Sequence, residues 1–156
     1  MRLWVVYVMA APAMRGLTYF KIGITTDIAK RVCGVQTGCP LRITKIWTMA
    51  TVRNGSAQSI ESRMHQSLAL YHSHGEWFAM STDDPDHKAA MNEAMRIGRE
   101  LANGGNGPAW NAVSVPDLKT AVRELAREVA LDGRNKAAEL RKKAIVKMVT
   151  EGRQVA

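Results

Sequence analysis

The sequence predicts an α+β protein, with a small antiparallel sheet flanked by helices and a helical extension at the C-terminus. Two observations predict this class. Segments in the first half are rich in β-branched and aromatic residues, some with alternating apolar and polar positions, which is typical of strands. Other segments, and both segments near the C-terminus, carry apolar residues at helical spacing instead.

Length and composition narrow the class further. The 156 residues can hold one domain of ordinary size with a small appendage, and the formal net charge of +8 favours a polyanionic partner such as DNA. Cys33 and Cys39 are too few for a disulfide framework, so we expect a cytoplasmic protein. The apolar N-terminus partly mimics a signal peptide, but a single Arg and Pro12 count against one. No stretch is long enough for a transmembrane helix, so we expect no membrane partner.

Three segments are predicted to be strands. Residues 3–9 have the composition of a largely buried strand, and residues 43–51 alternate between apolar and polar positions. In residues 18–24, Tyr19, Lys21 and Gly23 share one face, because successive side chains of a strand point to opposite sides. We expect the first two strands to form a hairpin through a connector at 10–17, and residues 76–80 to be a short strand or extended segment.

Helices are predicted between and after these strands. Thr25-Thr26-Asp27 can cap a helix over 26–36, and Thr37-Gly38-Cys39-Pro40 stops it. A turn at 53–56 precedes a second helix over 57–71, which His72 to Gly75 ends. A third helix lies within 83–102, after a helix-start cluster of Asp and Pro residues.

A Gly-rich and Asn-rich stretch divides the chain. We place the main domain at 1–102, a linker at 103–115 and a basic helical hairpin at 116–156, with helices over 116–131 and 137–149. Such a hairpin cannot bury its apolar faces alone. It is therefore expected to dock on the main domain or on a second copy of the chain, as a homodimer.

Six short motifs occur in order along the first 80 residues. They are Val6-Tyr7-Val8, Lys21-Ile22-Gly23, Arg31, Gln36-Thr37-Gly38 with Pro40, Glu61 with His65, and Gly75-Glu76-Trp77-Phe78. Together they resemble the GIY-YIG nuclease superfamily, and more narrowly its phage-associated branch with Lys-Ile-Gly in the second motif and a closing Gly-Glu-Trp-Phe. The resemblance covers about residues 3–80. It implies a three-stranded antiparallel sheet flanked by helices and metal-dependent hydrolysis of a DNA phosphodiester on the open face of the sheet.

The resemblance also implies roles for individual residues. Tyr7 would lie near the attacking water, Arg31 would contact the scissile phosphate, and Glu61 would hold a divalent cation, Mg²⁺ or Mn²⁺. These residue types suit the chemistry, because a guanidinium and a metal ion stabilise the negative charge that develops on phosphorus. Lys21 stands where a second Tyr is expected and could depress the pKa of Tyr7. His65 could position a water or act as the base, so the general base stays open between Tyr7 and His65.

Further residues are expected to support DNA binding or structure. Tyr19 and Gly23 belong to the strand face, where Gly23 would leave room for the substrate. The basic C-terminal residues Arg141, Lys142 and Lys143 could add phosphate contacts. Trp77 and Phe78 are expected in the core, with Glu76 bridging to a basic residue. A zinc site can be assembled from cysteines and histidines, but the spacing matches no common zinc finger. Its members would be Cys33, Cys39, His65, His72 and His74.

Three functions are consistent with these features. The first is a phage or mobile-element DNA endonuclease. The second is a catalytically inactive DNA-binding or regulatory protein on the same fold. The third is a phage factor that inhibits a host defence complex through a protein partner. Without the resemblance, Tyr7 would be an ordinary strand tyrosine, and Glu61 with His65 a solvated pair on a helix.

Overall fold

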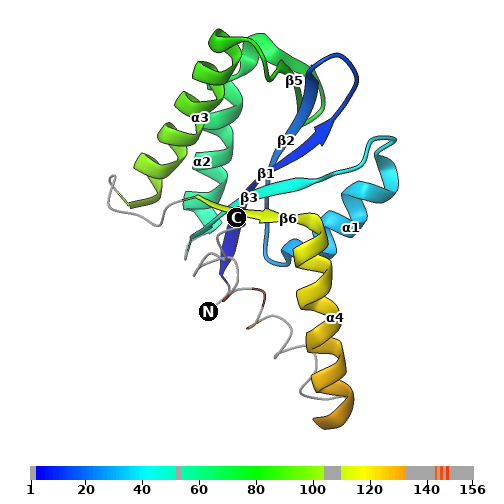
Figure 1. Ribbon diagram of the computed structural model, residues 1–156. Helices are drawn as coiled ribbons and strands as arrows, with labels where there is room; N and C mark the ends of the chain where they lie inside the picture. The colour runs from blue at the N-terminus through cyan, green and yellow to red at the C-terminus, as the bar shows by residue number, and fades with distance from the viewer. Residues whose placement is uncertain are drawn as a thin grey trace.

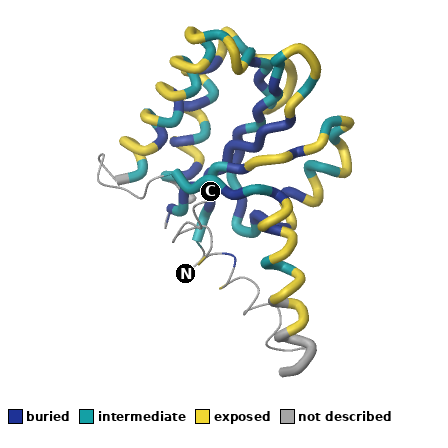
Figure 2. Tube along the Cα trace, in the orientation of Figure 1, coloured by how far each residue is buried: buried dark blue, intermediate teal, exposed yellow. Residues whose placement is uncertain are grey.

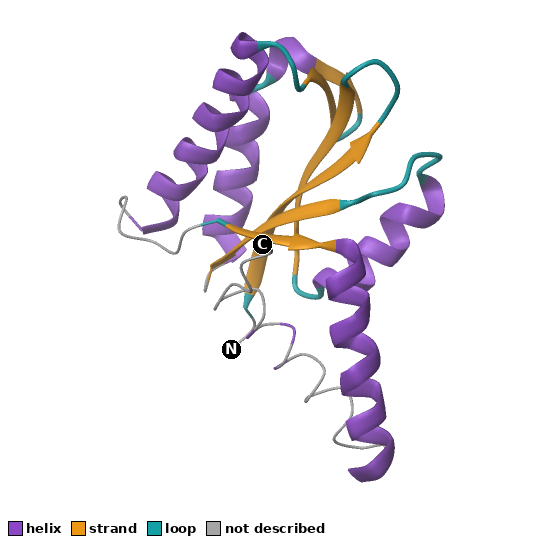
Figure 3. Ribbon diagram, in the orientation of Figure 1, coloured by secondary structure: helices purple, strands orange, loops and turns teal. Residues whose placement is uncertain are grey.

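A single antiparallel sheet organises the chain. The computed structural model describes residues 3–51, 54–103 and 110–132, together with Lys143, Ile145 and Lys147. Within these residues, six strands pair in the order β4-β5-β2-β1-β3-β6, and every neighbouring pair is antiparallel. The α+β class is therefore confirmed, whereas the three-stranded sheet is wrong in number. The three strands predicted first form the centre of the sheet (Figure 3).

The central strands follow the alternation of the sequence. β1 (Trp4–Pro12) lies between β2 (Leu17–Thr25) and β3 (Lys45–Thr51). The predicted hairpin is present, but its loop is shorter than expected. Both strands extend into the expected connector at 10–17, since backbone pairing continues as far as Pro12 opposite Thr18.

The edge strands were the harder ones to predict. β5 (Trp77–Ser81) matches the expected extended segment, but β4 (His72–His74) replaces the expected end of a helix. β6 (Asn111–Ser114) lies inside the stretch expected to be a linker at 103–115. This part of the stretch is a strand instead, because it pairs with β3 and buries Val113.

Helices cover both faces of the sheet (Figure 1). α2 (Asn54–Ser67) and α3 (Pro85–Asn103) pack on one face, and α1 (Ile28–Gly38) and α4 (Val115–Asp132) lie on the other. Alternate residues of β1 supply the two apolar cores: Val6 and Val8 face α2 and α3, whereas Val5, Tyr7 and Met9 face α1 and α4. Buried strands between helices with exposed outer faces are visible in Figure 2.

Local signals explain most of the helix ends. Asp27 caps α1, since its side chain accepts a hydrogen bond from the Lys30 backbone N–H at 3.1 Å. α2 begins at Asn54, so residues 54–56 of the expected turn are helical, and a 3₁₀ helix, η1 (Ala69–Tyr71), follows it.

α4 matches the first helix of the predicted hairpin. It docks on the sheet through Val115 and Leu118, which belong to the core on the α1 side. Most of the second predicted helix, at 137–149, lies outside the described residues, although Ile145 is buried in the same core. Among the described residues, no helix combines the length and the apolar composition that crossing a bilayer requires.

Candidate active site

The ring of Tyr7 lies directly against Gly23. The two residues are partners across β1 and β2, and Tyr7 is 1% exposed. A Cβ added to Gly23 would lie 2.6 Å from Cζ of Tyr7 and 3.2 Å from Cε2, which is too close for any side chain. We expected Gly23 to leave room for a substrate. In the structure, the ring of Tyr7 occupies that room, so the glycine of the second motif makes space for the tyrosine of the first.

The Tyr7 hydroxyl lies in a charged environment contributed by three other elements. Burial raises the pKa of Tyr7 to about 12, and the nearby carboxylates of Glu76 and Glu61 raise it further, whereas Arg31 opposes the shift. With that pKa, Tyr7 is ionised in only about one molecule in 10⁵ at neutral pH. Tyr7 is therefore a neutral phenol that can donate or accept a hydrogen bond.

Arg31 reaches this environment from α1. Its backbone N–H donates to the carbonyl oxygen of Asp27, the capping residue, at 3.0 Å, which places Arg31 at the end of the first turn. The residue is exposed, while Ile28 and Val32 on the other side of the helix are buried. The cap and the apolar stripe thus orient the guanidinium toward solvent, within electrostatic range of both Tyr7 and Glu61.

α2 is attached to β2 through His65. The ring Nε2 lies 2.9 Å from the carbonyl oxygen of Ile22, so Nε2 carries the proton that it donates, and the ring edge packs on Phe78. The register of β2 and β5 ends at Lys21 opposite Trp77, and beyond it the Ile22 N–H still donates to the carbonyl oxygen of Glu76 at 3.3 Å. His65 therefore satisfies a carbonyl group just beyond the paired part of this edge. Glu61 lies one turn earlier on the same face of α2.

Lys21 is paired with the carboxylate of Glu76, the residue that directly precedes β5. Its Nζ lies 2.6 Å from Oε2 of Glu76 and 5.7 Å from the centre of the Trp77 ring. The side chain of Lys21 is 15% exposed and that of Glu76 is 47% exposed, so the pair lies at the surface of the cluster. The expectation that Glu76 bridges to a basic residue is confirmed.

The environment of Glu61 disfavours the ionised form of its carboxylate. Burial raises its pKa, and the neighbouring carboxylate of Glu76 raises it further, whereas His65, Lys21 and Arg31 lower it. The ionised form is therefore less stable here than in water. A cation beside this oxygen donor would reverse the effect, because it would stabilise the charged form.

A hard divalent cation such as Mg²⁺ needs fewer protein donors than a zinc ion does. Mg²⁺ commonly uses one or two protein carboxylates and completes its coordination with waters and substrate phosphate oxygens. Glu61 supplies one such carboxylate, and Glu76 lies within electrostatic range of it. The donors do not fit a zinc site. Within the described ranges, no three His, Cys, Asp or Glu side chains are grouped so that they could hold a metal.

The other predicted residues lie apart from this cluster or outside the described residues. Tyr19 is half-buried on the same strand face as Lys21, two residues earlier on β2. Lys143 is exposed, and Arg141 and Lys142 lie outside the described residues. His72 contacts the carbonyl oxygen of Gly75, at 2.8 Å, rather than another possible zinc ligand.

Glu76 belongs to the charged cluster; the sequence predicted that it bridges to a basic residue, but not that its charge acts on Tyr7 and Glu61. Its charge affects the pKa of both Tyr7 and Glu61. One signal could have revealed it. Glu76 directly precedes Trp77, the partner of Lys21, so strand pairing brings its carboxylate next to the second motif.

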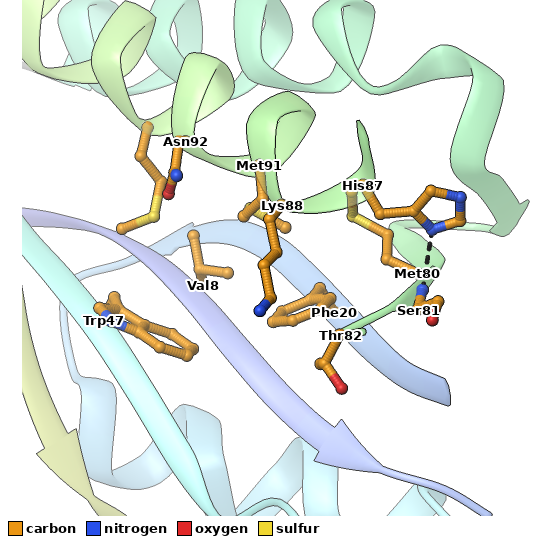
Figure 4. A pocket seen from close by; sticks show the side chains of 11 residues that line it. Val8, Phe20, Trp47, Met80, Ser81, Thr82, His87, Lys88, Met91 and Asn92 are labelled. Carbon is orange, nitrogen blue, oxygen red and sulfur yellow. Dashed lines mark hydrogen bonds between the residues drawn. The ribbon is translucent and has the colours of Figure 1, made fainter. Parts of the chain in front are cut away.

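A separate hollow lies on the other face of the sheet. This pocket of about 270 Å³ is bounded by Val8, Phe20 and Trp47 of the central strands and by Lys88 and Met91 of α3 (Figure 4). The predicted site residues do not line it. The candidate site is therefore the cluster of Tyr7 on the α1 side of the sheet, Arg31 of α1, and Glu61 from the middle of α2, the helix that contacts β2 through His65.

The sheet, the buried tyrosine and the surrounding Arg, Lys and Glu side chains define an α+β protein with a charged cluster at its sheet. The chain belongs to the T5orf172 domain family, whose model matches residues 5–97. This is a phage-associated domain related to GIY-YIG and HNH-like nucleases. The match includes all residues of the cluster and ends before β6 and α4. No curated protein and no solved structure shows significant similarity to the chain.

Proposed function

We propose that this protein is a divalent-metal-dependent DNA endonuclease of phage or mobile-element type that acts in the cytoplasm. One observation carries the proposal. Tyr7 of β1, Arg31 of α1 and Glu61 of α2 come from separate elements, yet the charges of Arg31 and Glu61 both act on the pKa of Tyr7, and that of Arg31 acts on Glu61 as well. A core that needed only apolar packing would not place a buried phenol, a guanidinium and a destabilised carboxylate together. The net charge of +8 supports a polyanionic substrate.

Each residue has a role that its environment supports. Glu61 would hold Mg²⁺ or Mn²⁺, and the bound ion would neutralise phosphate charge and acidify a water. Arg31 is exposed and free to contact a phosphate, for which its planar guanidinium is well suited. Tyr7 keeps its proton at neutral pH, so it would orient the nucleophilic water through a hydrogen bond rather than remove its proton.

His65 supports the site through structure. Because its Nε2 donates to the Ile22 carbonyl oxygen, only Nδ1 could accept a proton without breaking that contact. We propose that His65 fixes α2 against β2 and thereby sets the position of Glu61, one turn away. The phage-associated Lys-Ile-Gly and Gly-Glu-Trp-Phe branch fits this arrangement, since Lys21 and Glu76 of those motifs form the ion pair beside the cluster.

Plasmid cleavage tests the proposal. Wild-type protein with Mg²⁺ or Mn²⁺ is expected to nick supercoiled DNA, whereas Glu61→Gln and Arg31→Ala should still bind DNA but not cut it. Matched controls change the same charges on the exposed face of α3, with Glu93→Gln and Arg99→Ala, and should cut like wild type. If the wild type binds DNA but does not cut it with either metal, the nuclease proposal is wrong.

That outcome would support the second candidate, a DNA-binding or regulatory protein without catalysis. The observation that favours it is the pKa of about 12 for Tyr7, because at neutral pH almost no tyrosinate is present to act as a general base. If DNA binding is also absent, both candidates fail. The third function, inhibition of a host defence complex through a protein partner, would then be the one that stands.

A further inference from the structure

A groove of about 700 Å³ lies near the candidate site, and Lys21 is the residue that connects the two. Its floor includes Tyr19 and Lys21 of β2 and Trp77 of β5, and its far wall is formed by Gly38, Cys39 and Leu41 at the end of α1. The volume is within the range of ~300–1,000 Å³ that is common for ligand sites. Lys21 is shared, since it lines the groove and also influences the charge of Glu61.

The lining chemistry points to a nucleobase. Trp77 and Lys21 are partners across the two strands, with Lys21 Nζ 5.7 Å from the centre of the Trp77 ring, and Tyr19 lies two residues earlier on the same face of β2. Tyr19, Trp77 and Leu41 are only partly buried, which leaves ring and apolar surface available to a ligand. Aromatic surface beside a cation is how proteins bind single-stranded nucleic acid, through base stacking and phosphate contacts.

The position of the groove limits the kind of substrate. Tyr19 is about 7 Å from Lys21 along the strand, because a strand rises ~3.4 Å per residue. Lys21 is already paired with Glu76 at 2.6 Å, so a phosphate would have to share or displace that carboxylate, and a base attached next to such a phosphate could reach Tyr19. In an intact duplex both faces of that base are stacked, so only an unpaired or extruded base can enter the groove.

We infer that this groove binds an unpaired nucleotide next to the cleaved phosphate. The inference rests on the proposed function and adds to it a substrate class, DNA with single-stranded nucleotides beside the cleavage site. Branched, gapped or flapped DNA would then be the preferred substrate over continuous duplex.

Two glycines of α1 offer a matched pair of variants. No atom lies within 4 Å of a Cβ added at Gly38 or at Gly34, so both positions accept a larger side chain. Gly38 lines the groove, and Gly34 is exposed one turn earlier without lining it. Gly38→Leu should therefore fill the groove, while Gly34→Leu makes the same change outside it.

Binding of a labelled oligothymidylate in the presence of EDTA tests the inference without any cleavage. Gly38→Leu and Tyr19→Leu should each weaken binding by about 5- to 150-fold, the effect of losing one stacked base, which is worth ~1–3 kcal/mol. Gly34→Leu should bind like wild type. The inference is overturned if Gly38→Leu and Gly34→Leu bind the oligonucleotide equally, or if continuous duplex of the same length binds as tightly as the single strand.

Thiol protection gives a second readout. In a Cys33→Ser variant, the remaining Cys39 lines the groove, and bound oligothymidylate should slow its alkylation. In the reciprocal Cys39→Ser variant, the exposed Cys33 lies outside the groove and should react at an unchanged rate. Equal protection of both thiols contradicts the inference.

The two proposals fail in different ways. If the protein cuts plasmid but its binding of oligothymidylate does not depend on the groove, the nuclease proposal stands and the groove inference fails. If binding depends on the groove but plasmid is not cut, the nuclease proposal fails and the groove is a single-strand binding site on a protein that does not cleave DNA.

Discussion

Replacement of Gly23 by Ala should destabilise the protein, although Ala is normally the better residue in a strand. The added Cβ would lie 2.6 Å from Cζ of Tyr7, whose ring is 1% exposed and cannot move into solvent. Overpacking of this kind costs about 1–3 kcal/mol. We therefore expect Gly23→Ala to lower the free energy of unfolding by about 2 kcal/mol and the Tm by about 4–8 °C.

A double-mutant cycle isolates the cause. In a Tyr7→Leu background the ring is gone, so Gly23→Ala should stabilise the protein by roughly 0.5–1 kcal/mol, the usual gain over Gly. The sign of the effect reverses, and the coupling free energy should be about 2–3 kcal/mol. Gly34→Ala is the control, since it lies on exposed α1 with nothing within 4 Å of its Cβ and should stabilise the protein in both backgrounds.

Urea denaturation followed by circular dichroism measures these differences. The reasoning is refuted if Gly23→Ala costs the same free energy in both backgrounds. Gly23 would then be required by something other than the Tyr7 ring.

Three other predictions concern ionisation and hydrogen bonding. Burial holds the pKa of Tyr7 at about 12 in the folded state, above that of an unfolded tyrosine, so stability should fall between about pH 10 and pH 12 as the unfolded chain loses this proton first. A Tyr7→Phe variant should lack that component of alkaline unfolding. Because the folded-state pKa of Glu61 is raised, its contribution to stability is present at acid pH and lost as pH rises through that pKa. Glu61→Gln should therefore have a higher Tm than metal-free wild type at neutral pH, but the same Tm at acid pH. Added Mg²⁺ should raise the Tm of the wild type and not that of the variant. Equal Tm values for the two proteins at every pH would contradict this prediction. The hydroxyl of Thr48 is buried and has no hydrogen-bond partner among the described residues, so Thr48→Val should raise the free energy of unfolding by about 1 kcal/mol. Thr25→Val is its control and should lower it by about 1 kcal/mol, because the Thr25 hydroxyl accepts from the Asp27 backbone N–H at 3.1 Å.

The central strands and the helices could be predicted because their signals are local. Alternating side chains identify β2, and apolar residues at helical spacing identify α4, whose observed bounds differ from those expected by one residue at each end. The cap could be predicted to lie within Thr25-Thr26-Asp27, and the structure assigns it to Asp27. The residues of the candidate site were found through motifs that resemble a known superfamily, and the family match includes them.

The edge strands could not be predicted in the same way. β4 and β6 are three and four residues long, too short for a periodic pattern. They are strands because β5 and β3 present unpaired backbone groups beside them. Pairing of that kind depends on which segments meet in space, and a Gly-rich neighbourhood such as that before β6 suggests a linker when the sequence is considered alone.

The sequence by itself determined the α+β class and the three central strands, since composition and periodicity act within a few residues, whereas the residues of the candidate site came from the resemblance of its motifs to a known superfamily. Only the tertiary structure decided how those residues are used. The strand register placed the Tyr7 ring on Gly23, brought Glu76 to Lys21, and turned His65 into a donor to Ile22. Each of these contacts joins residues at least 16 positions apart, and a shift of one residue in register would move the side chains of a strand to the other face.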